Sequence, residues 1–127
     1  MTDLFKAIMI RYAAVPLASS LTGLWNTLAP QDAVFPYGVF SLISDVPDWT
    51  FSENLENILL QFNLFSKASD PVQICALYTL LKTAFDFLDL TIDNYETVYM
   101  VRENAILTRI EDVWQYNVTY RILLGKL

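Results

Sequence analysis

The sequence predicts an α+β fold in which helices pack on one face of a mainly antiparallel, four-stranded sheet made of two hairpins. Residues 112–124 alternate between apolar and polar side chains, as a strand with one buried and one wet face does. Residues 71–88 instead carry apolar side chains at helical spacing. The elements follow in the order α-(β)-β-β-α-β-β, and residues 1–127 are expected to form a single domain.

The first predicted helix covers residues 2–14 and ends before Pro16. Thr2 or Asp3 can cap its first turn, and its apolar residues recur at helical spacing: Leu4, Phe5, Ile8, Met9 and Tyr12. The next stretch, residues 17–28, is compatible with a helical turn or a short strand. A short strand near residues 22–27 is favoured.

The first hairpin is expected from a strand at residues 37–44 and a strand at residues 53–66, joined by a loop at residues 45–52. Pro36 has no amide hydrogen and therefore belongs at the start or edge of a strand, while Gly38 indicates a bulge or a close backbone approach. In the second strand Leu60, Phe62 and Leu64 share the buried face.

Asp70 and Pro71 then mark the start of the most regular predicted helix. Cys75, the only cysteine, is expected to be a small buried residue of this helix and has no partner for an internal disulfide. The second hairpin pairs a strand at residues 95–108 with residues 112–124. Its last strand turns one set of residues to the core, namely Trp114, Tyr116, Val118, Tyr120 and Ile122.

Composition argues against several classes of function. The formal charge is −6 and the eight basic residues are scattered, which disfavours a protein that binds nucleic acid by itself. Histidine is absent, so the commonest general base and neutral metal ligand are missing. Asp86, Asp89 and Asp93 have the spacing of a solvated helix end, not of a calcium loop. The sequence therefore predicts no catalytic site, no cofactor and no metal.

A stretch without charge runs from Arg11 to Asp32, but its prolines and polar residues argue against a membrane-spanning helix. Asp3, Lys6 and Arg11 likewise interrupt any signal-peptide core. We expect neither a membrane span nor a targeting segment.

Two groups of residues are candidates for contact with another chain. The first contains aromatic residues beside turn-rich segments, because aromatic side chains are enriched in the centres of interfaces: Trp25, Phe35, Tyr37 and Trp49. The second is the polar side of the last strand: Gln115, Asn117, Thr119 and Arg121.

Residues 24–37, LWNTLAPQDAVFPY, resemble the "short strand, A-P-x-x-A-x-F-P-Y, strand" opening of the tail-terminator, or tail-completion, proteins of long-tailed phages. Residues 58–66 and 114–120 resemble later strands of that family, in the same order. The resemblance covers residues 20–123.

The resemblance implies a structural virion protein, made in the host cytoplasm, that forms a ring, commonly a hexamer, at the head-proximal end of the tail. Such a ring caps the tail tube, stops its polymerisation and offers a surface for head–tail joining. Its partners would be further copies of itself, the tail tube protein and the head connector or neck protein. DNA would pass through the hole without specific binding, and an acidic chain would discourage it from sticking. The polar side of the last strand would then face a neighbouring subunit or the hole.

Two alternatives remain open at this point. A head-completion or neck adaptor protein is also a ring and would bind the portal instead of ending the tube. A cytosolic α+β module would hold an apolar small ligand between the sheet and a helix. An enzyme is a third class, disfavoured by the missing histidine and by the lack of a convergent polar set.

Overall fold

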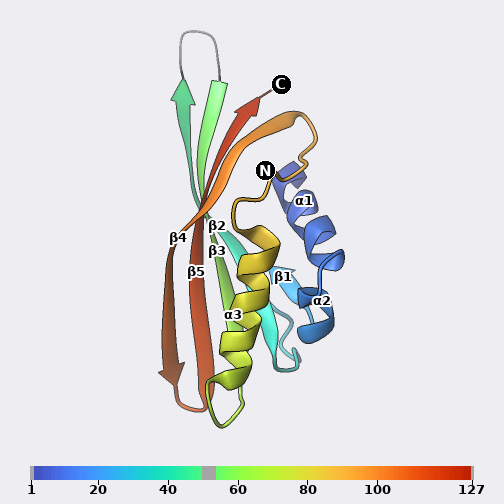
Figure 1. Ribbon diagram of the computed structural model, residues 1–127, viewed down its shortest axis with the longest axis vertical. Helices are drawn as coiled ribbons and strands as arrows, with labels where there is room; N and C mark the ends of the chain where they lie inside the picture. The colour runs from blue at the N-terminus through green and yellow to red at the C-terminus, as the bar shows by residue number, and fades with distance from the viewer. Residues whose placement is uncertain (1, 50–53, 127) are drawn as a thin grey trace.

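The computed structural model describes residues 2–49 and 54–126, without the side chains of Asp48 and Trp49 (Figure 1). The helices are α1 (Thr2–Ala13), α2 (Leu17–Ser20) and α3 (Val72–Phe85). The strands are β1 (Leu24–Asn26), β2 (Tyr37–Trp49), β3 (Asn54–Ser66), β4 (Tyr95–Ile110) and β5 (Val113–Lys126). The predicted α+β class is confirmed, and the predicted elements occur in the expected order, with α2 as an additional short helix before β1.

The sheet has five strands in the order β1-β2-β3-β5-β4, and α1, α2 and α3 lie on the same side of it (Figure 1). β1 runs parallel to β2 and the other pairs are antiparallel. The prediction of a mainly antiparallel, four-stranded sheet was therefore wrong in strand count, because β1 adds a fifth strand, and this strand makes the one parallel pair. Gly38 leaves room for two buried leucine side chains, because a Cβ at this position would lie 3.0 Å from a methyl carbon of Leu24 and 3.2 Å from one of Leu64.

The first hairpin is longer than the sequence predicted. The expected loop at residues 45–52 is strand up to Trp49, and its ladder pairs Asp45 with Ile58 and Pro47 with Glu56. Pro47 is compatible with a strand here because β1 covers β2 only at Gly38–Phe40, so that Pro47 lies on an edge of the sheet. Residues 45–49 therefore form an edge strand, although their composition is typical of a loop.

The second hairpin agrees more closely with the prediction. β4 and β5 are joined by two turn residues, Glu111 and Asp112, and Glu111 has a φ of 56°. Positive φ is the conformation that tight hairpin turns between twisted strands require.

Alternate residues of the strands pack against the helices and form the core. Phe62 of β3 is fully buried, its ring centroid 4.8 Å from that of Phe85 in α3 and 5.7 Å from that of Tyr120 in β5. Phe40 and Leu81 are fully buried in the same cluster. Full burial of aromatic side chains on this scale contributes several kcal/mol each, of order 2–3.

Cys75 contradicts its prediction, since it is exposed on α3. The buried residues of this helix are Ile74, Leu77, Leu81, Ala84 and Phe85. Cys75 is one residue, about 100° of helical rotation, past Ile74 and falls outside this stripe.

Asp86, at the end of α3, is not the simply solvated residue that the sequence predicted. It accepts a 2.5 Å hydrogen bond from the hydroxyl of Tyr120, and Arg102 lies 3.5 Å from its other oxygen. Burial, followed by this bond to Asp86, raises the pKa of Tyr120 well above its ordinary value. Asp86 therefore satisfies the one polar group of a largely buried tyrosine.

None of the helices in the described part of the chain has the length and apolar composition needed to cross a bilayer.

Candidate assembly surface

The side of the sheet opposite the helices, here called the open face, is formed by the other alternate residues of each strand. Strand pairing arranges them in rows across the sheet. One row joins Trp25, Val39, Asn63, Asn117 and Ile106. The next row down the sheet is Tyr37, Phe65, Gln115 and Thr108, and the next row up is Ser41, Gln61, Thr119 and Asn104.

Six of the eight residues predicted from sequence as contact candidates belong to the open face: Trp25, Tyr37, Gln115, Asn117, Thr119 and Arg121. Phe35 precedes β2 and packs on Tyr37, with ring centroids 5.0 Å apart. Trp49 ends β2, and its side chain lies outside the described residues. The two candidate groups thus come from distant parts of the chain but share one surface.

An aromatic corner occupies one end of the open face and consists of Trp25, Phe35, Tyr37 and Phe65. Tyr37 is at its centre, with its ring stacked 4.9 Å from Phe65 and 5.9 Å edge-on from Trp25. Lys67 Nζ lies 4.9 Å from the centroid of Phe35. All four rings are half-buried, so each still presents part of its surface to a partner.

The connection after β1 overhangs this corner. Residues 27–31 and the side chains of Tyr37, Val39, Asn63 and Phe65 enclose a hollow of about 380 Å³. Sequence reasoning missed Phe65. Its strict alternation with the buried Leu64 and Ser66 is the signal that places it on the open face.

Amides and hydroxyls fill the middle of the open face. Gln61 Nε2 donates to Thr119 Oγ1 at 3.5 Å, and Thr119 is only 8% exposed. Asn117 Oδ1 is buried and finds no hydrogen-bond partner within the described residues. These side chains are therefore more sheltered than a solvated polar surface would be.

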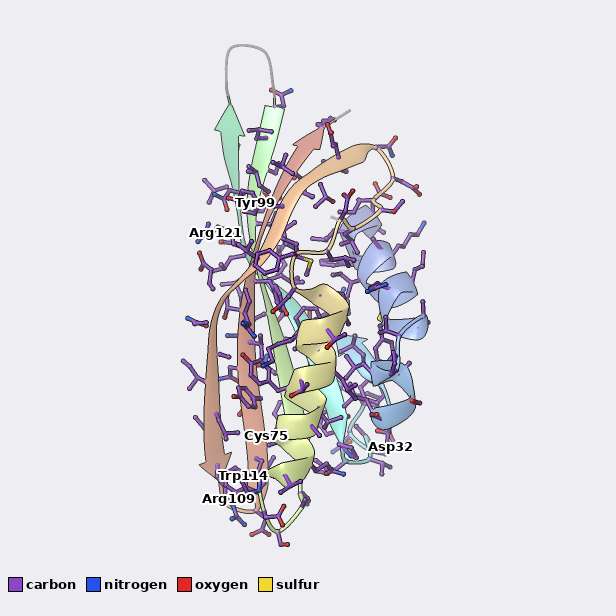
Figure 2. The ribbon with its side chains drawn as sticks, in the orientation of Figure 1. Asp32, Cys75, Tyr99, Arg109, Trp114 and Arg121 are labelled. Atoms are coloured by element: carbon purple, nitrogen blue, oxygen red, sulfur yellow. The ribbon has the colours of Figure 1, made fainter. Side chains whose placement is uncertain are left out.

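Arg121 is held firmly on the open face and points away from the helices (Figure 2). Its Nε donates to Glu103 Oε1 at 2.5 Å and its Nη1 donates to Asn57 Oδ1 at 2.6 Å. The bond to Glu103 raises the pKa of the Arg121 guanidinium. Arg121 pairs with Leu59 and Val101 in a further row of the sheet. Between the Tyr37 row and this row, Arg121 and Glu103 are the charged side chains of the described open face, so the residues that give the net charge of −6 lie elsewhere.

Such an arrangement suits contact between surfaces more than chemistry on a small molecule. It combines half-buried aromatic rings, neutral hydrogen-bonding groups and a fixed ion pair, which together resemble the composition of a protein interface. Within residues 2–49 and 54–126, no three acidic or cysteine side chains gather closely enough to hold a metal ion.

The fold of the whole chain is similar to that of proteins with known structures. No protein-family model matches the sequence, and no curated protein matches it. Among solved structures, one chain of "Virion of native gene transfer agent (GTA) particle" aligns with a TM-score of 0.83 at 16% identity, covering 98% of this chain and 96% of that chain. A second solved chain aligns with a TM-score of 0.50 at 12% identity, over 96% of this chain and 94% of that chain. At these identities the likeness establishes the fold, which this chain shares over its full length with a component of a virion.

Proposed function

We propose that this chain is a structural virion protein of the tail-terminator type, which forms a ring, caps the tail tube and provides the surface for head–tail joining. The observation that carries the proposal is the full-length match of its fold to a chain of a gene transfer agent virion. The resemblance of residues 24–37 to the opening of tail-completion proteins supports the finer role.

The open face supports a role in assembly. A protein that remains a monomer gains little from placing half-buried Trp25, Tyr37 and Phe65 together on the side of its sheet away from the core. Neutral amides in the middle of the face keep it soluble before assembly and can hydrogen-bond to a partner afterwards. The proposed partners are further copies of this chain, the tail tube protein and a neck protein.

A neck adaptor is the nearest alternative, because it is also a ring and would also be part of a virion. Binding separates the two roles: a terminator binds the end of the tail tube, and an adaptor binds the portal.

A small-ligand module is disfavoured by the packing between the helices and the sheet. Phe40, Phe62 and Phe85 are fully buried there and fill the space in which such a ligand would lie. The described hollows instead open at the surface.

Negative-stain electron microscopy of the purified protein, alone and mixed with tail tubes, tests the proposal. We expect rings of uniform size that attach to tube ends and stop further growth of the tubes. A uniform monomer that leaves tube ends free and growing would contradict it. Rings that bind portals and ignore tubes would indicate the adaptor instead.

A further inference from the structure

Over its first half the outer edge of β4 is partly covered, since Phe87 N donates to Met100 O and Ile92 bridges to Tyr95. Over its second half, from Asn104 to Ile110, the edge is free within the described residues. β4 pairs with β5 on one side, and no strand pairs with its other side within the described residues. Soluble proteins guard such an edge with charged residues, above all lysine, with proline, with bulges or with a very short strand. β4 contains neither lysine nor proline, and Arg109 is the one charged residue of its second half, Asn104–Ile110. After the irregularity at Arg102/Asn104 the strand runs without interruption to Ile110, and Ile106 and Ile110 are 53% and 65% exposed.

The opposite edge of the sheet carries an apolar groove. The groove measures about 480 Å³ and lies between α1 and the β1–β2 pair. Its walls are mostly apolar, and Ile10 is 71% exposed. The lining residues include Phe5, Lys6, Met9, Ile10, Asn26 and Phe40. One molecule therefore presents an unpaired strand with apolar side chains at one edge and an apolar groove at the other.

Strand directions let these two edges meet between identically oriented copies. The strands β2, β3, β5 and β4 alternate in direction, and β1 is parallel to β2, so β4 runs antiparallel to β1. A second copy placed beside the first without being turned over would thus offer its β1 in the favourable antiparallel sense.

The pairing register also puts the two edges at the same height. Asn26, Phe40, Phe62, Val118 and Ala105 form one row across the sheet. A copy displaced along this row brings its groove, which Asn26 and Phe40 line, to the segment of β4 around Ala105.

We propose that the β4 segment Asn104–Ile110 of one copy docks on the β1–α1 edge of a second copy, extending the sheet from subunit to subunit. The contact is heterologous, so it repeats around a ring and leaves no copy with a free β4 edge once the ring closes. This proposal rests on the proposed function for its ring and adds the surfaces that join the subunits. A symmetric contact between two β4 edges would leave the groove empty.

Disulfide trapping tests this interface directly. Both test variants carry Cys75→Ser, which removes an exposed thiol. Asn26→Cys goes into one variant and Ala105→Cys into the other. We expect a crosslinked dimer when the two variants are mixed and oxidised, and none when either is oxidised alone. A single chain with both substitutions should give a ladder that ends at the size of the ring.

The other possible outcomes would contradict the interface, the proposed function or both. Dimers from Ala105→Cys alone would indicate the symmetric contact. Rings seen by microscopy without any crosslink would overturn this interface and leave the proposed function standing. A chain that stays monomeric, alone and with tail tubes, would overturn both.

A matched pair of substitutions on β4 provides a second test. Ile106→Lys places a charge within the docking segment, and Val98→Lys places one on the same strand outside it, at nearly equal exposure of 53% and 55%. We expect Ile106→Lys to weaken association about tenfold or more and Val98→Lys to change it less than about twofold. Equal effects of the two lysines would contradict the proposal.

Discussion

The two faces of this sheet are built from the same strands but differ in what holds their side chains. In β3, Phe62 is fully buried against α3, while its neighbour Asn63 lies on the open face and faces Asn117 of β5. In β5, Tyr120 is buried and bonded to Asp86, while Arg121 is bonded to Glu103 on the other side. Because side chains alternate along each strand, one set of residues packs in the core and stabilises the fold. The adjacent set lies on the open face, where it can contact a partner.

The largest expected effect is on the covered face. Phe62→Ala should lower the free energy of unfolding by about 3–5 kcal/mol, because it leaves a cavity beside Phe85 and Tyr120. Asn63→Ala is the matched control on the open face and should change the free energy by less than about 1 kcal/mol. Urea unfolding followed by circular dichroism measures both. Equal losses of unfolding free energy in the two variants would mean that the open face contributes to folding as much as the covered face does.

Tyr120→Phe should have the next largest effect, about 1–2 kcal/mol, since the variant loses the hydrogen bond to Asp86. Tyr116→Phe is the control, because it retains the ring stacked on Tyr78 and the bond between Tyr120 and Asp86. Thermal unfolding of the three proteins under the same conditions gives the comparison.

The deficit of Tyr120→Phe should also depend on pH. The folded-state pKa of Tyr120 is raised above its unfolded value, so its contribution is complete below about pH 10 and is lost as the pH rises towards the folded pKa. The difference between wild type and variant should therefore shrink above about pH 10. A difference that grew in alkali would refute this account of the phenol.

Glu56→Gln should stabilise the protein modestly at pH 7. Glu56 Oε2 is buried without a hydrogen-bond partner among the described residues, and burial and then Asp45 raise the pKa of this carboxyl. The folded state thus favours the protonated form, so ionisation costs stability as the pH rises through the folded pKa. The gain in unfolding temperature should disappear near pH 4, where wild-type Glu56 is protonated as well. A loss of stability at pH 7 would show that the charged form is needed.

Arg121→Met should have the smallest effect on folding. Its bonds to Glu103 and Asn57 lie at the solvent-accessible open face, where salt weakens ion pairs. We expect a slightly lower unfolding temperature that becomes indistinguishable from wild type in 1 M salt, a concentration at which the Debye length is about 3 Å. A large loss of stability that persists in high salt would show that Arg121 contributes to folding as the residues of the covered face do.

Side-chain periodicity made much of this fold predictable. Alternation located β3 and β5 and their buried faces, and the helical stripe located α3. Three features escaped because their local signals are weak or misleading. β1 has only three residues and no signal for its direction, residues 45–49 have the composition of a loop, and Cys75 adjoins an apolar stripe without belonging to it.

The candidate surface was predictable in part for the same reason. Alternation alone put Gln115, Asn117 and Thr119 together, but nothing local could reveal that Trp25 and Tyr37 lie on that same face. That juxtaposition depends on the strand order, in which β5 lies between β3 and β4. Which strands form the two edges of the sheet also depends on this long-range pairing, and the periodicity of the sequence does not reveal it.

The central claim is that the open face serves assembly and contributes little to folding. The variant Gln115→Lys/Asn117→Lys tests it most directly, because it adds two positive charges to the open face, where long side chains can reach solvent. Two measurements on the same preparation are needed: the thermal unfolding midpoint, and the fraction of tail tubes capped at wild-type length. The account predicts a nearly unchanged midpoint with capping abolished. Capping at the wild-type level by a folded variant would contradict it.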